Sequence, residues 1–292
     1  MGVSDSVRIA PGSASWPRCL DTIEAAPEGL WVRGPLAVLR REPRIAIVGT
    51  RSPTPYGEGQ ALRFARAFAR AGIVVVSGLA RGIDQAAHRG ALESGGDSIA
   101  VLGSGVDRPW PAGPVTDALL SSGLLVSEFP PGMGPRRHHF PLRNRIISGL
   151  AAGVLVVEAA WASGSLITAR WAVDQGRTVF AIPGRVDHPM ARGTLRLIRE
   201  GATPVESPEQ VLEDLFGSVA AALAARTGPA PKGPTPKGLA AEILAALEGE
   251  TASADDLARQ LGRPVARVLA ELVELELAGA IARCPGGLYR RA

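Results

Sequence analysis

Six short runs of mostly β-branched, apolar residues recur along the sequence, and they constrain the fold more than any other feature. They cover residues 44–50, 73–78, 98–103, 124–128, 154–159 and 178–184. Short apolar runs of this kind are typical of strands buried on both faces of a parallel sheet. Helical, Ala-rich segments such as "GQALRFARAFARAG" separate them. The sequence therefore predicts an α/β fold with a doubly wound, mostly parallel sheet connected by right-handed crossovers.

The sequence changes character after residue 216. A Pro/Gly/Lys-rich segment that includes "GPAPKGPTPK" predicts an extended linker over residues 217–237. Residues 238–292 contain three helical patterns and two short strand patterns around Pro-Gly-Gly, which predict a winged helix-turn-helix. We therefore divide the chain into an N-terminal segment leading into the sheet (1–44), the sheet domain (45–216), the linker (217–237) and a winged-helix domain (238–292).

The last helical pattern of the C-terminal domain is acidic. It contains Glu271, Glu274 and Glu276, which makes a poor surface for a DNA groove. A protein-interaction role is therefore favoured for the winged-helix domain over duplex recognition.

Composition limits the location and class of the protein. A hydrophobic content of 46% is enough for a substantial core, and no apolar run approaches the roughly 18 residues of a membrane span. No secretory signal is visible, and Cys19 and Cys284 are too far apart in sequence to indicate a disulfide framework or a metal site. We expect a cytoplasmic protein without membrane contact. The net charge of +4 is a weak indication of an anionic partner.

The usual motifs of nucleotide and hydrolase chemistry are missing. The sequence has no G-x-G-x-x-G after the first strand, no G-x-x-x-x-G-K-[ST] and no G-x-S-x-G. His138 and His139 have no nearby cysteine or carboxylate to complete a metal site. Asp84 and His88 have the i, i+4 spacing of an acid/base pair, but a structural role in the loop is the favoured interpretation. We expect no enzyme activity, catalytic residue, cofactor or metal.

A basic stretch without acidic residues follows the fourth predicted strand. Between Met133 and Arg145 it contains Arg136, Arg137, Arg143 and Arg145 and no Asp or Glu. Such a cluster is either a solvated loop or an anion site. In open α/β sheets, ligands bind at the carboxyl ends of the strands, where this loop is expected to lie.

The segment "ASGSLIT", residues 162–168, begins a helix after the fifth strand and has two interpretations. Small hydroxyls and free N–H groups at a helix N-terminus form a phosphate site, whereas a serine there is also an ordinary N-cap. Convergence favours the phosphate site, because Arg51 follows the first strand and the arginines and Phe140 follow the fourth. Phe140 either stacks on an unpaired base or packs in a corner with Pro141; stacking would favour a single strand.

Several segments together resemble one family. "VGTRSPTPYG", "SGLARGIDQAAHRGAL", "IAVLGSGVD", "HFPLRNRIISGL" and "VVEAAWASGSLITARWAVDQGRTVFAIPG" are similar, in the same order, to the DNA-processing protein A family, DprA or Smf, from about Trp16 to Phe216. The resemblance implies an extended Rossmann-like sheet without nucleotide chemistry. It also implies a homodimeric, single-stranded DNA-binding recombination mediator that helps load RecA in natural transformation.

The same resemblance implies a set of DNA-binding residues. Arg143 is expected to face the DNA, and Asn144 or Arg145 to brace the loop. The full expected set is Arg51, Arg137, Phe140, Arg143, Asn144, Arg145, Ser163, Gly164, Ser165 and Thr168.

The sequence departs from the family pattern at two places. Trp110-Pro111 stands where relatives often have Tyr-Pro, and Leu195 or Arg196 stands near a position that is often Asn. Two other functions were weighed. A Rossmann-like nucleotide phosphoribohydrolase would have "PGGxGTxxE" where this chain has "ASGSLIT", and a duplex-binding regulator would need a less acidic winged helix.

Overall fold

The large domain is built on one nine-stranded sheet with the strand order β1-β2-β6-β5-β4-β3-β7-β8-β9. A computed structural model of the protein describes residues 6–217, 238–277, 280–284 and 286–291. The predicted linker lies almost entirely outside these residues. The strands are Ser6–Ile9 (β1), Leu30–Arg33 (β2), Arg44–Val48 (β3), Val74–Ser77 (β4), Ser98–Val101 (β5), Leu124–Ser127 (β6), Gly153–Val156 (β7), Thr178–Ala181 (β8) and Thr203–Pro204 (β9).

Strands β3 to β9 run parallel to one another, and the six apolar runs predicted six of them, β3 to β8. Three strands of this sheet were not predicted. One is the two-residue strand β9, and the others are β1 and β2, which pair antiparallel with each other; β2 also pairs antiparallel with β6. The N-terminal segment is thus part of the sheet, not only a lead into it. Its Leu20 and Leu30 are fully buried in the main core, which explains why this segment folds with the larger domain.

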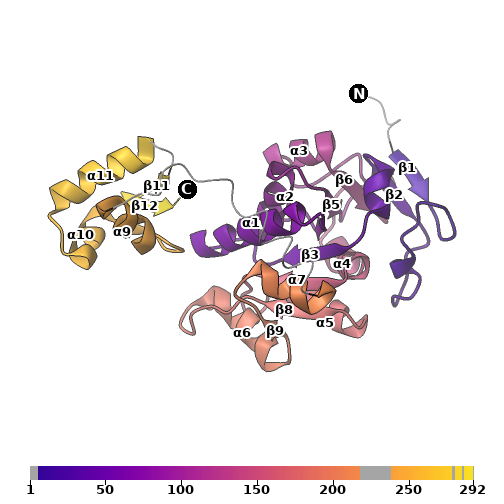
Figure 1. The fold of residues 1–292 in the computed structure, drawn as a ribbon. Helices are drawn as coiled ribbons and strands as arrows, with labels where there is room; N and C mark the ends of the chain where they lie inside the picture. Colours follow the sequence, from indigo (N-terminus) through magenta and orange to yellow (C-terminus); the bar gives the residue numbers. More distant parts are fainter. Residues whose placement is uncertain (1–5, 218–237, 278–279, 285, 292) are drawn as a thin grey trace. The chain divides into compact units, whose positions relative to one another are not determined.

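Helices cover both faces of the sheet (Figure 1). On one face, Ile146 and Ile147 of α4 and Ala169 of α5 pack against alternate strand residues such as Val48 and Val76. On the other face, Leu119 of α3 packs against Ala100 and Leu125. The helices of this domain are Pro55–Arg70 (α1), Ile83–Glu93 (α2), Pro114–Ser122 (α3), His139–Leu150 (α4), Ser165–Asp174 (α5), Arg192–Arg199 (α6) and Pro208–Phe216 (α7).

The strand order reverses between β3 and β7. The chain runs outward from β3 through β4 and β5 to β6, and α4 then returns it to β7 on the other side of β3. The loops after β3 and β7 are joined by a hydrogen bond from the Thr50 N–H to the Glu158 carbonyl, 2.7 Å long. A reversal of this kind opens a crevice at the carboxyl ends of the strands, which is where open α/β sheets bind ligands.

The C-terminal residues form a second compact unit with its own core. The helices α9 (Leu239–Ala246), α10 (Ala254–Leu261) and α11 (Val265–Leu277) pack beside a small sheet of order β10-β12-β11 (Ala252–Ser253, Leu288–Arg291 and Ile281–Cys284). Ser253 begins α10 with a capping box that includes Asp256. The winged-helix prediction is confirmed. Within the described residues, no helix has both the length and the apolar character needed to cross a membrane.

Candidate nucleic-acid interface

A pocket of about 940 Å³ opens at the reversal between β3 and β7, and we call it the strand-end pocket. Loops after β3, β4 and β7, the stretch before α4, and the N-terminal turns of α4 and α5 form its walls. All expected DNA-binding residues except Arg145 line it: Arg51, Arg137, Phe140, Arg143, Asn144, Ser163, Gly164, Ser165 and Thr168. Of its lining residues, Asp84 is the only acidic one.

Arg143 lies in the floor of the strand-end pocket with only 3% of its surface exposed. Its guanidinium donates to the carbonyl of Gly78, at 2.6 Å, and to the carbonyl of Val101. These carbonyls end the neighbouring strands β4 and β5, so Arg143 binds the two strand ends together. A Cβ at position 78 would lie 2.3 Å from the guanidinium, so glycine is required there for Arg143 to enter. Arg143 thus lines the pocket and also braces the strand ends behind it, and the expectation that it faces DNA stays a prediction.

Asp84 is the acidic counterpart of Arg143 in the same floor. Its carboxylate accepts hydrogen bonds of 3.2 Å from the N–H groups of Gly78 and Ala80, which ties the loop after β4 to α2. Burial raises the pKa of Asp84, and the nearby charge of Arg143 opposes that rise. Burial likewise lowers the pKa of Arg143 to about 10, so the guanidinium keeps its proton at neutral pH. The two groups offset each other's charge behind the pocket.

His88 lies one turn beyond Asp84 and belongs to the same buried layer. Its Nδ1 is 2.7 Å from the hydroxyl of Ser98, and its Nε2 is buried without a partner among the described residues. Burial, with a smaller contribution from the charge of Arg143, lowers the pKa of His88 to about 3. The imidazole is neutral and held inside the domain, which is the structural role that the favoured interpretation of the Asp84/His88 spacing predicted.

Asn144 connects the two helices that form the pocket. Its side-chain nitrogen donates to the carbonyl of Gly164 at 3.3 Å, and its oxygen accepts from the Arg143 Nε at 3.1 Å. The amide therefore fixes the N-terminal turn of α5 relative to α4. The protein's own hydrogen bonds thus hold this wall of the pocket in place.

The N-terminus of α5 has a pair of serine hydroxyls. The N-cap residue is Gly164, which has no side chain to cap the helix, and the Ser163 hydroxyl accepts a 3.4 Å hydrogen bond from the N–H of Ser165, the first helical residue. The hydroxyls of Ser163 and Ser165 lie 2.8 Å apart, and the described residues include no acceptor for the Gly164 N–H. Ser163 therefore satisfies one N–H of the first turn without occupying the N-cap position. The Gly164 N–H and the two hydroxyls are donors suited to an anion at the positive end of the helix dipole.

Aromatic and cationic side chains form the rim of the strand-end pocket. The Arg51 guanidinium lies over the ring of Phe140, 5.5 Å from its centroid, and the ring of Trp110 lies 5.6 Å from that of Phe140. Arg51 is exposed, Phe140 is partly exposed, and Trp110 is 41% exposed. Within the described part of the chain, no carboxylate forms an ion pair with Arg51. The rim therefore presents an available cation beside two aromatic rings.

Trp110 was not predicted to belong to the site. A signal for it was present in the sequence, because Trp110 stands in the loop after the third predicted strand, at a position where relatives often have a tyrosine before proline. Arg137, which was predicted, is exposed and lines the pocket, whereas its exposed neighbour Arg136 does not.

Arg145 lies away from the strand-end pocket, on the side of α4 that faces the N-terminal segment. Its guanidinium donates to the carbonyls of Ala25 and Leu142, both at 2.8 Å, and to the carboxylate of Glu128 at 2.5 Å. The side chain is 7% exposed. Its donors are used by the fold, so Arg145 braces α4, in line with one of the two roles that its position suggested.

These observations first define a class. The chain is a doubly wound α/β protein with a preformed, basic, aromatic-rimmed pocket at the topological switch point, followed by a winged-helix domain. Within the described residues, no group of His, Cys, Asp and Glu is arranged to hold a metal ion.

The family model of DNA recombination-mediator protein A matches residues 8–216, and the model of the DprA winged helix domain matches residues 226–287. The chain belongs to the DprA/Smf family of DNA recombination mediators.

Similar proteins come from several bacteria. Protein Smf of Escherichia coli is 44% identical over 279 residues, covering 94% of this chain and 74% of that protein. The crystal structure of DNA processing protein A from Streptococcus pneumoniae is 40% identical with a TM-score of 0.69, covering 73% of this chain and 75% of that one. A structure of DNA processing protein A from Helicobacter pylori, described as giving insight into the single-stranded DNA binding mode of that protein, is 27% identical with a TM-score of 0.65, covering 72% of this chain and 95% of that one.

Proposed function

We propose that this protein binds single-stranded DNA in the strand-end pocket and helps load RecA recombinase onto strands taken up in natural transformation. The observation that supports this most is the joint presence of Arg51, Phe140 and Trp110 at the rim of one pocket. Base stacking needs an unpaired base, so an aromatic rim beside cations suits a single strand better than a duplex. Membership of the recombination-mediator family supports the same function.

The residues of the pocket take different roles in this proposal. Arg51 and Arg137 bind phosphates, because both are exposed and a guanidinium pairs with phosphate through its planar fork. Ser163, Gly164 and Ser165 bind a further phosphate at the N-terminus of α5, with Thr168 in the turn behind them. Arg143 and Asn144 keep the pocket in shape, and Arg145 makes no DNA contact.

We further infer that the protein acts as a homodimer and without chemistry on its DNA. The absence of the nucleotide-hydrolase motif from "ASGSLIT" supports a binding protein.

The proposal is tested by measuring the affinity for fluorescent single-stranded oligonucleotides over a salt series, with the matching duplex as control. Log affinity should fall linearly with log salt, with a slope of about −0.7 for each phosphate neutralised on a single strand. The duplex should bind more weakly at every salt concentration. A flat salt response, or tighter binding of the duplex, would contradict the proposal.

Activity is measured on the same preparation. The protein should accelerate RecA filament formation on single strands, and substitution of Arg51 should reduce that effect in parallel with the affinity. Hydrolysis of nucleoside monophosphates should stay at the rate of a no-protein control. Turnover of a nucleotide would favour a phosphoribohydrolase instead.

A further inference from the structure

The third helix of the winged-helix domain, α11, has an apolar face that the domain itself does not cover. Its inward face packs Val268, Leu272 and Leu275 into the small core. On the outward face, Val265, Leu269 and Val273 are 38%, 42% and 51% exposed. These three residues are spaced by four, so they form one stripe along the helix, and the exposed Ala266 and Ala270 widen it. Exposed apolar residues in a contiguous stripe mark an interaction surface.

The charges beside this stripe are arranged with a polarity. Arg267 is in the N-terminal half of α11, and Glu274 and Glu276 are in the C-terminal half, all of them exposed. This is the reverse of what the helix dipole favours, since acidic residues stabilise N-termini and basic residues C-termini. Helix stability therefore does not account for the arrangement. Among the described residues, neither Arg267 nor Glu274 forms an ion pair.

We propose that the outward face of α11 is a contact surface for a second copy of this chain, with the two α11 helices packed antiparallel. Arg267 and Glu274 are separated by seven positions, about two turns, so they lie on the same edge of the stripe. In an antiparallel pair the same edges of the two helices meet. Arg267 of each copy then faces Glu274 of the other, and the contact is self-complementary under a two-fold axis.

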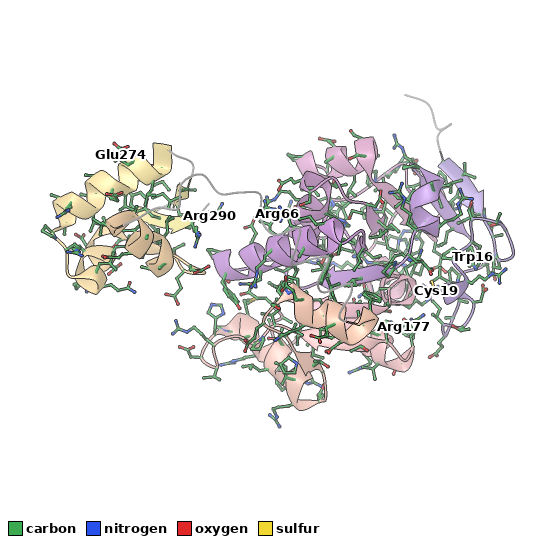
Figure 2. All side chains as sticks on the ribbon, in the orientation of Figure 1. Trp16, Cys19, Arg66, Arg177, Glu274 and Arg290 are labelled. Carbon is green, nitrogen blue, oxygen red and sulfur yellow. The ribbon has the colours of Figure 1, made fainter. Side chains whose placement is uncertain are left out.

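A parallel pair would lack this complementarity, because it brings the acidic ends of the two helices together. The centre of the apolar stripe, Leu269, and the midpoint of Arg267 and Glu274 are offset by about 2 Å along the helix, which long side chains can span. Glu274 projects from α11 away from the other helices of its domain (Figure 2). The small side chains of Ala266 and Ala270 allow the two helices to approach closely.

The same surface is poorly suited to DNA. A winged helix normally reads a duplex with the third helix, yet the described outward face of α11 combines an apolar stripe with two carboxylates and one arginine. Phosphates would be repelled by Glu274 and Glu276. A second copy of α11 satisfies both the apolar residues and the charges.

The contact is expected to be weak on its own. A stripe that spans residues 265–273 is about 13 Å long, and one helix pair of that length buries well under the ~1,000 Å² of a stable interface. The association should therefore depend on concentration and add to any dimer that the large domain forms. It would be stronger where several copies are held close together on one DNA strand, and that consequence rests on the proposed function.

The test is sedimentation velocity of the full chain over two decades of protein concentration. Leu269→Asp should raise the apparent dissociation constant of the concentration-dependent step at least about tenfold. The substitution is at an exposed position, so circular dichroism should report an unchanged fold. Any dimer made by the large domain is common to both proteins and cancels in the comparison. Equal association of Leu269→Asp and the unsubstituted protein at every concentration would overturn the proposal.

Charge reversal tests the antiparallel arrangement. Arg267→Glu and Glu274→Arg should each weaken association by roughly fivefold, and the double variant should restore it, since the two pairs are re-formed with opposite sign. Failure of the double variant to recover would overturn the antiparallel pairing. Affinity for single-stranded DNA, measured at concentrations below association, should not change in any of these variants. If Leu269→Asp lowers DNA affinity and leaves association unchanged, α11 is a DNA-binding helix and the proposal is wrong.

Discussion

Two pairs of arginines that are close in sequence differ in exposure to solvent in this protein. Arg136 and Arg137, just before α4, are exposed, whereas Arg143 and Arg145, within α4, are 3% and 6% exposed. In the sequence they form one basic stretch. In the structure, α4 passes beneath the strand ends, so arginines within the helix are surrounded by backbone carbonyls while those before it remain in solvent.

The difference is in what the guanidinium groups bind. Arg143 and Arg145 donate to carbonyls of Gly78, Val101, Ala25 and Leu142, so their donors are consumed by the fold. Asp84 also offsets the charge of Arg143 inside the domain. The positive potential available to a ligand therefore comes from Arg51 and Arg137. Basic residues in one stretch of sequence divide into those that shape a site and those that bind at it.

The largest expected effect concerns the buried arginine. Arg143→Met should lower the free energy of unfolding by about 3–5 kcal/mol, because it leaves Asp84 buried without its counter-charge and two strand-end carbonyls without a donor. Urea unfolding measures the change. Adding Asp84→Asn should recover part of the loss, since no uncompensated carboxylate remains. An unchanged free energy of unfolding together with lost DNA affinity would mean that Arg143 binds DNA and does not brace the fold.

The second effect tests whether the buried residues behind the strand-end pocket, among them Asp84, His88 and Arg143, are shielded from water. The pKa of His88 is lowered to about 3, so between about pH 6.5 and pH 3 the unfolded chain binds a proton that the folded chain does not. This contribution to stability is complete above pH 6.5 and is lost as the pH falls, by about 1.4 kcal/mol per unit, or roughly 2.7 kcal/mol by pH 4.5.

Urea unfolding over this pH range gives the slope. His88→Gln cannot titrate, so it should remove about 1.4 kcal/mol per unit of the slope below pH 6. If the two proteins lose stability equally on acidification, His88 is hydrated and the buried layer is not as dry as its geometry indicates.

The third effect is on binding and compares neighbouring arginines. Arg137→Glu and Arg51→Glu should each reduce single-strand affinity at least about tenfold, or 1.4 kcal/mol, because a charged hydrogen bond is worth roughly 1.5–3 kcal/mol. Both side chains are exposed, so melting temperatures should stay the same.

Arg136→Glu is the matched control for Arg137→Glu, because it makes the same charge change one residue away and outside the strand-end pocket. It should alter affinity by less than about threefold, which is the long-range part of the charge effect. Equal losses for Arg136→Glu and Arg137→Glu would mean that net charge, rather than the pocket, determines binding.

The smallest expected effect concerns a neutral donor. Ser163→Ala should weaken single-strand binding by about fivefold, near 1 kcal/mol, the usual contribution of one uncharged hydrogen bond. Stability should fall only slightly, since the Ser163 hydroxyl accepts a long hydrogen bond of 3.4 Å from the Ser165 N–H and does not occupy the N-cap position of α5. A loss of stability with unchanged affinity would return Ser163 to the role of a helix cap.

The central sheet was predictable because each of its buried strands has its own apolar run. Strands β3 to β8 lie within the predicted runs or within one residue of them, as with Arg44–Val48 in the run 44–50. The N-terminal strands β1 and β2 and the two-residue strand β9 were not predictable in the same way. Ser6–Ile9 and Leu30–Arg33 are only partly buried, and they are strands because β2 pairs with β6, far away in sequence, and β1 pairs with β2.

The location of the site could be predicted from the sequence, but the contacts of its individual side chains could not. The carboxyl-end rule brought Arg51, Phe140 and Ser163 together from three distant segments, as the pocket lining confirms. It could not give the direction of Arg143. That direction depends on the missing side chain of Gly78 and on the carboxylate of Asp84, and no local pattern connects these residues with α4.

The margins of the large sheet have a consequence for solubility. An exposed edge strand has unpaired N–H and C=O groups that can pair with a strand of another molecule, so it is a common starting point for aggregation. Here one margin is β1, whose outward-facing Arg8 places a charge on it, and the other is β9, which has two residues of which Pro204 has no N–H to donate. Growth of the sheet from molecule to molecule is thereby disfavoured, and the protein can be concentrated along a DNA strand without its main sheet becoming a template for fibres.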